Sequence, residues 1–234
     1  MGRSDDARCV IAIDAGTTGV RSRAVFVDGR PAVAAYREFA QHFPSPGWVE
    51  HDASEIWEVA ATTLREVIDE VGRSNVAAIG ITNQRETVLA WNRSTGETYG
   101  NAIVWQDRRT ASRCDELAAA GHLALIRERT GLVLDPYFSG TKAAWLLEHR
   151  DIPVDDDLAI GTIDSWLVWN LTGGRRFVTD ATNASRTMLC DIRTCTWDPE
   201  LCELLGVPIA ALPEIVPSSG RIASTSADCG VPEG

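Results

Sequence analysis

Residues 9–27 of the chain read CVIAIDAGTTGVRSRAVFV, and this stretch decides the fold class. It opens with a short apolar run, rich in β-branched residues, which predicts a buried strand. The glycines of segment 15–19 (AGTTG) predict a tight turn, and segment 21–27 (RSRAVFV) predicts a second strand. The Asp-Gly pair at 28–29 favours a hairpin, which makes 32–39 a third strand. The chain is therefore expected to open with a three-stranded antiparallel meander.

Helices and strands alternate after this meander. Asp52 and Glu55 have the spacing of a capping box, and the residues that follow have the apolar periodicity of an amphipathic helix. The absence of an internal repeat or a glycine/serine linker favours one mixed α/β domain over residues 1–234. The remaining predicted strands are 76–82, 87–91, 177–179 and 187–190, and the remaining predicted helices are 110–120, 123–129, 141–149, 163–171 and 199–205.

The chain is acidic, with 33 Asp and Glu against 22 Lys and Arg and a formal net charge of -11. A field of this sign repels phosphate backbones, which argues against nucleic acid as a partner. The first apolar run is far shorter than the ~20 residues that a membrane span needs. Since no signal-peptide pattern stands at the N-terminus either, we expect a cytoplasmic protein without a membrane span.

The cysteines of this chain do not have the spacing of a metal site. There is no CxxC pair with a nearby histidine, and a disulfide scaffold is not expected in a chain of this length. We therefore expect reduced thiols, most of them buried. The six are Cys9, Cys114, Cys190, Cys195, Cys202 and Cys229.

The first candidate site is the turn that joins the first two predicted strands. Asp14 ends a strand, where a carboxylate can hold Mg²⁺ through water. Gly19 lets the backbone approach a phosphate closely, while Thr17 and Thr18 add hydroxyl donors and Arg21 adds positive charge. The same residue types also form ordinary hairpin turns, so the pattern leaves both interpretations open. It is not a Walker A loop.

The second candidate site follows the strand predicted at 76–82. Arg85 and Glu86 are adjacent, and such a pair can bracket a vicinal diol because Arg donates to hydroxyls and Glu accepts from them. Tyr137 can do either, and Trp105 offers a flat apolar face for polyol carbons. The alternatives are a solvated Arg–Glu surface pair, a core tryptophan and a packed loop tyrosine.

The opening segment DAGTTGVR (14–21) resembles that of the FGGY carbohydrate kinases, which have the actin-like (ribonuclease H-like) ATPase fold. Six further blocks, in the same order, narrow the resemblance to the glycerol kinases of that family. The resemblance implies ATP-dependent phosphorylation of glycerol, with Mg²⁺ as the cofactor of ATP. The blocks are PGWVEHD (46–52), AIGITNQRET (78–87), NAIVWQDRRT (101–110), GLVLDPYFSGTK (131–142), GTIDSW (161–166) and TDATNASRTML (179–189).

The resemblance also implies roles for individual residues. The positions implied to contact nucleotide phosphates or lie beside them are Thr17, Thr18, Gly19 and Arg21, with Asp14 near Mg²⁺. The positions implied to bind glycerol are Arg85, Glu86 and Tyr137, with Trp105 lining the pocket. Two residues depart from the pattern, since Ala15 stands where glycerol kinases usually have Gln and Gly19 where many have Ser.

Several charged residues inside the matching blocks are expected to support the structure. We interpret them as ion pairs and caps, and we interpret the histidine of the PGWVEHD block as structural too. These residues are Asp107, Arg108, Arg109, Asp164, Asp180 and His51.

The family's catalytic aspartate stands in a GDQ segment, and no such segment occurs in these 234 residues. The chain is therefore expected to be the N-terminal, polyol-binding domain of a kinase, inactive alone, with the C-terminal nucleotide-closing domain or a homo-oligomer as its partner. Two alternatives stay open: a non-catalytic remnant or binding module, and an FGGY kinase that acts on another polyol or a ketose.

Overall fold

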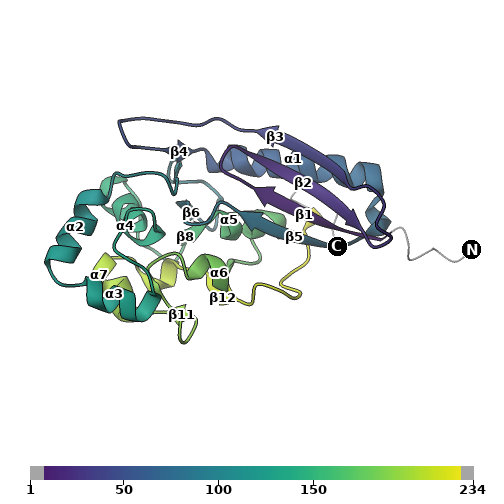
Figure 1. The fold of residues 1–234 in the computed structure, drawn as a ribbon. Helices are drawn as coiled ribbons and strands as arrows, with labels where there is room; N and C mark the ends of the chain where they lie inside the picture. The colour runs from purple at the N-terminus through teal and green to yellow at the C-terminus, as the bar shows by residue number, and fades with distance from the viewer. Residues whose placement is uncertain (1–7, 228–234) are drawn as a thin grey trace, which may run out of the picture.

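The computed structural model describes residues 8–227 and contains two four-stranded sheets (Figure 1). In the first sheet, β1 (Cys9–Ala15), β2 (Gly19–Phe26) and β3 (Val33–Glu38) form the predicted antiparallel meander. The strand β5 (Val76–Asn83) then adds to β1 in parallel, which gives the order β3-β2-β1-β5. This mixed sheet confirms the predicted α/β class.

The second sheet is antiparallel throughout and has the order β4-β7-β6-β8. Its strands are β4 (Glu50–His51), β7 (Ala102–Ile103), β6 (Val88–Asn92) and β8 (Leu158–Thr162). The strand β8 is buried at every position and pairs with β6, yet the sequence analysis missed it. Its apolar run does not alternate, so only its sheet partner shows that it is a strand.

The long helix α1 (Ala53–Val71) packs along β2 and β3 and covers one face of the first sheet (Figure 1). Asp52 caps it, because its carboxylate accepts hydrogen bonds from the main-chain N–H groups of Ser54 and Glu55. The Glu55 carboxylate accepts from the N–H of Ala40 instead of returning to Asp52. The cap is therefore confirmed, and the reciprocal half of the capping box is replaced by a contact to the segment before the helix.

The rest of the described chain is built from short elements, which include two further two-stranded sheets. One sequence prediction was wrong here: 187–190 is a turn up to Leu189, because Met188 has a φ of +63° that an extended strand does not allow. The short elements of the remaining chain are η2 (Arg73–Asn75), α2 (Ala111–Ala119), α3 (Leu123–Thr130), α4 (Ser139–His149), α5 (Ile163–Leu171), β9 (Val178–Asp180), α6 (Ala181–Ala184), β10 (Cys190–Asp191), β11 (Thr196–Trp197), α7 (Pro199–Leu205), η3 (Ile209–Ala211) and β12 (Glu214–Val216).

Two apolar clusters hold the fold together. One joins the first sheet, helices α1 and α5 and part of the second sheet, and the other lies between the second sheet and helices α2, α3, α4 and α7. All five cysteines in the described range are free thiols, four of them buried and Cys195 exposed, while Cys229 lies outside the described residues. Across residues 8–227, no helix is both long enough and apolar enough to cross a membrane.

Candidate functional site

The turn between β1 and β2 is a close-packed loop of three residues, Gly16, Thr17 and Thr18. The N–H of Gly16 donates to the carbonyl of Gly19 at 3.0 Å, which closes the loop. A Cβ atom on Gly19 would lie 2.5 Å from the carbonyl oxygen of Arg37 on β3. A larger residue at position 19 would force the neighbouring strand to shift, so this close approach favours glycine.

Two glutamine amides hold this turn from one side. Nε2 of Gln84 donates to the carbonyl of Gly16 at 3.1 Å, and Nε2 of Gln41 donates to the carbonyl of Thr17 at 3.0 Å. In a trans peptide the N–H points opposite to the carbonyl of the same unit. The N–H groups of Thr17 and Thr18 therefore point away from the glutamines. This arrangement is suited to an anion, because two neighbouring N–H groups can face one oxygen-rich ligand.

A buried histidine connects the two glutamines. His51 lies between Oε1 of Gln41, 2.7 Å from its Nε2, and Nε2 of Gln84, 3.2 Å from its Nδ1. The network assigns the proton to Nε2, since Nδ1 faces a donor. Burial lowers the pKa of His51 to about 4, with a smaller contribution from His42. The structural role expected for His51 is confirmed, and a protonated ring would place two donors against each other at Gln84.

Asp14 and Arg21 lie opposite each other on β1 and β2, and both side chains are exposed. The Arg21 guanidinium lies 5.3 Å from the centre of the Tyr36 ring. Within the described residues no group of three or more metal-ligating side chains comes together. A single exposed carboxylate fits hydrated Mg²⁺ only when phosphate oxygens supply further ligands, as Mg²⁺ in nucleotide sites requires.

Arg85 and Glu86 are adjacent in the sequence and have different surroundings in the fold. Arg85 is exposed and lines a groove, while Glu86 is 2% exposed and has a φ of +64°. The main-chain carbonyl of Glu86 accepts from Oγ of Ser139 at 3.0 Å. Its carboxylate accepts from Nε of Arg186 at 2.7 Å. The alternative of a solvated Arg–Glu pair is therefore wrong, because Glu86 is buried and its cationic partner stands 100 residues further along the chain.

Arg186 is the functional candidate that the sequence analysis missed. Its guanidinium lies 5.8 Å from the centre of the Tyr137 ring and 4.8 Å from that of Phe138. The Tyr137 and Trp105 rings are 5.4 Å apart and tilted by 58°. The only signal in the sequence was the position of Arg186 inside the TDATNASRTML block. The fold thus brings Glu86, Arg186, Tyr137 and Trp105 into one cluster, here called the aromatic–acid cluster.

This cluster touches the turn directly. Nε1 of Trp105 donates to Oγ1 of Thr17 at 3.0 Å, and the main-chain N–H of Trp105 donates to Oγ1 of Thr87 at 3.3 Å. Thr87 in turn donates to Oε1 of Gln84 at 2.9 Å, and Gln84 holds Gly16. The Trp105 and Tyr137 rings are here called the aromatic wall. Hydrogen bonds therefore join the turn and the aromatic wall along two routes.

The charged segment after Trp105 supports the structure, as expected. The Arg109 guanidinium pairs with Asp107 and Glu50, each at 2.8 Å, and lies 3.8 Å and 4.5 Å from the ring centres of Trp48 and Trp145. Its side chain is almost completely buried. The neighbouring Arg108 forms an exposed ion pair with Asp135 at 3.0 Å, which contributes little to stability.

Asp164 and Asp180 are also structural. Asp180 caps α6 by accepting from the N–H of Asn183 at 2.8 Å. Asp164 forms no ion pair among the described residues, and its carboxylate accepts from Oγ1 of Thr162, Oγ1 of Thr179 and the N–H of Asp180. Burial raises the pKa of Asp164, and the hydrogen bonds oppose that shift. The expected cap is confirmed for Asp180, while Asp164 is a buried hydrogen-bond acceptor.

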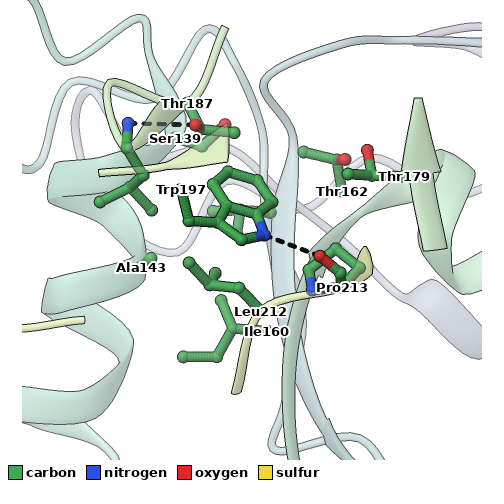
Figure 2. Close-up of a pocket in the computed structure, with 12 residues that line it drawn as sticks. Ser139, Ala143, Ile160, Thr162, Thr179, Thr187, Trp197, Leu212 and Pro213 are labelled. Atoms are coloured by element: carbon green, nitrogen blue, oxygen red, sulfur yellow. Dashed lines mark hydrogen bonds between the residues drawn. The ribbon is translucent and has the colours of Figure 1, made fainter. Parts of the chain in front are cut away.

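Two hollows differ greatly in size. A groove of about 890 Å³ runs along β5 and α5 and past residues 216–225, and it includes Arg85 but not the aromatic–acid cluster. A second cavity measures about 20 Å³ and is lined in part by Trp197, whose Nε1 donates to the carbonyl of Pro213 at 2.7 Å (Figure 2). The small cavity has room for about one water molecule. Of the two, only the groove has room for more than about one water molecule.

The sequence matches the N-terminal domain of the FGGY family of carbohydrate kinases over residues 9–232. It is 53% identical to a glycerol kinase of Dechloromonas aromatica over 232 residues, which are 97% of this chain and 46% of that protein. A crystal structure of Plasmodium falciparum glycerol kinase with ADP superposes with a TM-score of 0.81 at 34% identity, covering 89% of this chain and 43% of that one. Xylulose kinase from Rhodospirillum rubrum has the same fold, with a TM-score of 0.85 at 24% identity. That superposition covers 96% of this chain and 47% of the xylulose kinase chain.

The chain spans less than half the length of these relatives. Its match to the family nevertheless covers nearly every residue, from the first strand to the last described segment. The β1–turn–β2 unit, the third antiparallel strand and the parallel β5 all fall inside the matched region. This chain therefore belongs to the FGGY family of carbohydrate kinases and contains the N-terminal domain of that family.

Proposed function

We propose that the chain is the polyol-binding part of a glycerol kinase, which transfers the γ-phosphoryl group of ATP to a terminal hydroxyl of glycerol. One observation carries this proposal. The hydrogen bond from Trp105 to Thr17 places the aromatic wall against the turn suited to phosphate. Phosphoryl transfer depends mainly on holding the acceptor hydroxyl near the phosphate and in line with it, which this contact favours. The glycerol kinase relative at 53% identity supports the choice of substrate.

The residues around the turn have distinct tasks in this proposal. The N–H groups and hydroxyls of Thr17 and Thr18 bind phosphate oxygens, while Gly19 allows close approach and Arg21 supplies positive charge. Asp14 would hold Mg²⁺ through water. When bound, Mg²⁺ neutralises the charge that develops on the phosphate oxygens.

The aromatic–acid cluster binds the polyol. Arg186 fixes the carboxylate of Glu86 through Oε1, and we assign Oε2 to a substrate hydroxyl. Arg85 donates to a neighbouring hydroxyl from the groove side, and Tyr137 contributes its O–H. The Trp105 face packs against the carbon atoms of the polyol.

A general base must still take the proton of the attacking hydroxyl. We do not assign this role to Glu86, because its carboxylate already accepts from Arg186 at 2.7 Å and is assigned to holding the polyol. We therefore propose that the 234-residue chain binds polyol but has little or no turnover by itself, and that the base comes from a segment outside this chain.

Binding and turnover are tested separately. Calorimetry on the chain with glycerol, erythritol and xylulose is expected to give the tightest binding for glycerol, and tighter binding of another compound supports a different polyol or ketose. A coupled assay with ATP, Mg²⁺ and glycerol then follows, with and without the C-terminal half of the Dechloromonas aromatica enzyme. Turnover near the ordinary kinase rate of about 1–100 s⁻¹ is expected only in the complemented sample. Glycerol binding without turnover in either sample favours a binding module, and turnover by the chain alone contradicts the assignment of the base.

A further inference from the structure

Lys142 is the only lysine of a chain that uses arginine at its 21 other cationic positions, and it is completely buried. It lies on α4, and its relative exposure is 0%. Lysine is almost never fully buried unless its ammonium has partners, because burial removes the charge from water. The position therefore calls for a structural reason.

The reason lies in two main-chain carbonyls. Nζ of Lys142 donates to the carbonyl of Trp105 at 3.2 Å and to the carbonyl of Tyr137 at 3.1 Å. Both acceptors stand in loops, since Trp105 follows β7 and Tyr137 precedes α4. No ladder of sheet hydrogen bonds fixes these two segments relative to each other. One ammonium group joins them at the residues whose rings form the aromatic wall.

Charged groups around Lys142 shift its pKa without forming an ion pair with it. Among the described residues, no carboxylate lies within 4.0 Å of Nζ, and the carboxylates of Asp107, Glu86 and Asp135 act from a greater distance. Burial lowers the pKa of Lys142 to about 7, the three carboxylates oppose that shift and Arg109 adds to it. A neutral amine keeps two N–H donors, so both carbonyl bonds persist in either protonation state. Arginine would stay charged at this buried position and is much larger.

We propose that Lys142 is a positioning residue of the polyol site, which sets the distance and tilt of the Trp105 and Tyr137 rings by holding the main chain of both. The proposal rests on the proposed polyol function. We assign Lys142 no contact with the substrate, because its Nζ donates to the main-chain carbonyls of Trp105 and Tyr137. Loss of the ammonium is expected to displace the wall while the outer parts of the fold keep their structure.

The test compares Lys142→Met with Leu146→Met in the 234-residue chain. Leu146 is also completely buried on α4, one turn further on, and its substitution controls for a change in packing alone. With 5-fluorotryptophan incorporated, Lys142→Met is expected to move the ¹⁹F resonance of Trp105, which is assigned through Trp105→Phe, and to leave that of Trp197 in place. Glycerol affinity is expected to fall about 10-fold or more, since the two hydrogen bonds that hold Trp105 and Tyr137 are lost. Leu146→Met is expected to change neither quantity.

The outcomes separate this proposal from the proposed function. A folded Lys142→Met protein whose Trp105 resonance stays in place overturns the positioning role. If the unsubstituted chain fails to bind glycerol, the polyol function is contradicted, and the Trp105 resonance alone decides whether Lys142 sets the ring. If Lys142→Met does not fold, labelling with ¹³Cε-lysine reports one lysine signal in the unsubstituted chain. Movement of that signal at saturating glycerol supports the proposal, and a fixed signal overturns it.

Discussion

The indole N–H of Trp105 donates to the hydroxyl of Thr17 at 3.0 Å, across 88 residues of sequence. This bond joins the aromatic wall to the β1–β2 turn, and the Thr87–Gln84 route joins them a second time. A substrate that displaces the wall must therefore act on the turn as well. The turn and the aromatic wall are therefore expected to move together, because hydrogen bonds join them along two routes.

Trp105→Phe removes this donor and keeps an aromatic ring. We expect the free energy of unfolding to fall by about 1 kcal/mol, the usual contribution of one hydrogen bond. Amide hydrogen exchange at Thr17 and Thr18 is expected to become faster. Trp197→Phe is the matched control, since it loses an indole N–H bond to Pro213, which is not part of the turn. Equal acceleration of exchange at Thr17 in both variants would contradict the coupling.

Arg85→Ala tests the polyol site with little disturbance of the fold. Arg85 is exposed and lines the groove, so the stability change is expected to stay within about 0.5 kcal/mol. Glycerol binding, measured by calorimetry, is expected to be lost. Arg73→Ala removes another guanidinium from the same groove and is expected to preserve binding. Unchanged glycerol affinity in Arg85→Ala would contradict the assignment of Arg85 to the polyol site.

The Glu86–Arg186 pair is expected to matter for stability as well as for binding. Arg186→Met leaves the buried Glu86 carboxylate without its cation, which costs about 3 kcal/mol. Adding Glu86→Gln in that background removes the buried charge and is expected to restore part of the loss. Urea unfolding of the two single variants and the double variant forms a double-mutant cycle. Additive losses would show that the two side chains do not interact in solution.

Lys142 is expected to make stability depend on pH. Its pKa is about 7 in the folded chain, against an ordinary value of 10.5. Between these two values the unfolded chain binds one more proton at Lys142 than the folded chain does. The contribution of Lys142 to the free energy of unfolding therefore rises with pH across this window, and it is lowest below pH 7. Urea unfolding of the unsubstituted chain and of Lys142→Met at about pH 6.5 and about pH 9.5 measures the difference. The same pH dependence in both proteins refutes the prediction.

Local sequence signals predicted much of the secondary structure. The predicted helices 163–171 and 199–205 agree with α5 and α7 at both ends. The second begins at the Asp198 cap and ends at Gly206, which has a φ of +70°, and both are properties of neighbouring residues. The segment 187–189 is not a strand, because the backbone turns at Met188, whose positive φ its residue type does not indicate.

By itself, the sequence determined the meander, the long helix after Asp52 and the family resemblance, because these depend on periodicity, turn residues and contiguous blocks. The tertiary structure alone decided which residues meet. Glu86 pairs with Arg186 across 100 residues, and Lys142 holds Trp105 across 37. Such contacts depend on the parallel addition of β5, the pairing of β6 with β8 and the burial of α4. The residues next to each partner in the sequence do not indicate these contacts. Burial also separates Glu86 and Lys142 from the exposed charges of the candidate site, since it is the fold that places these two out of water.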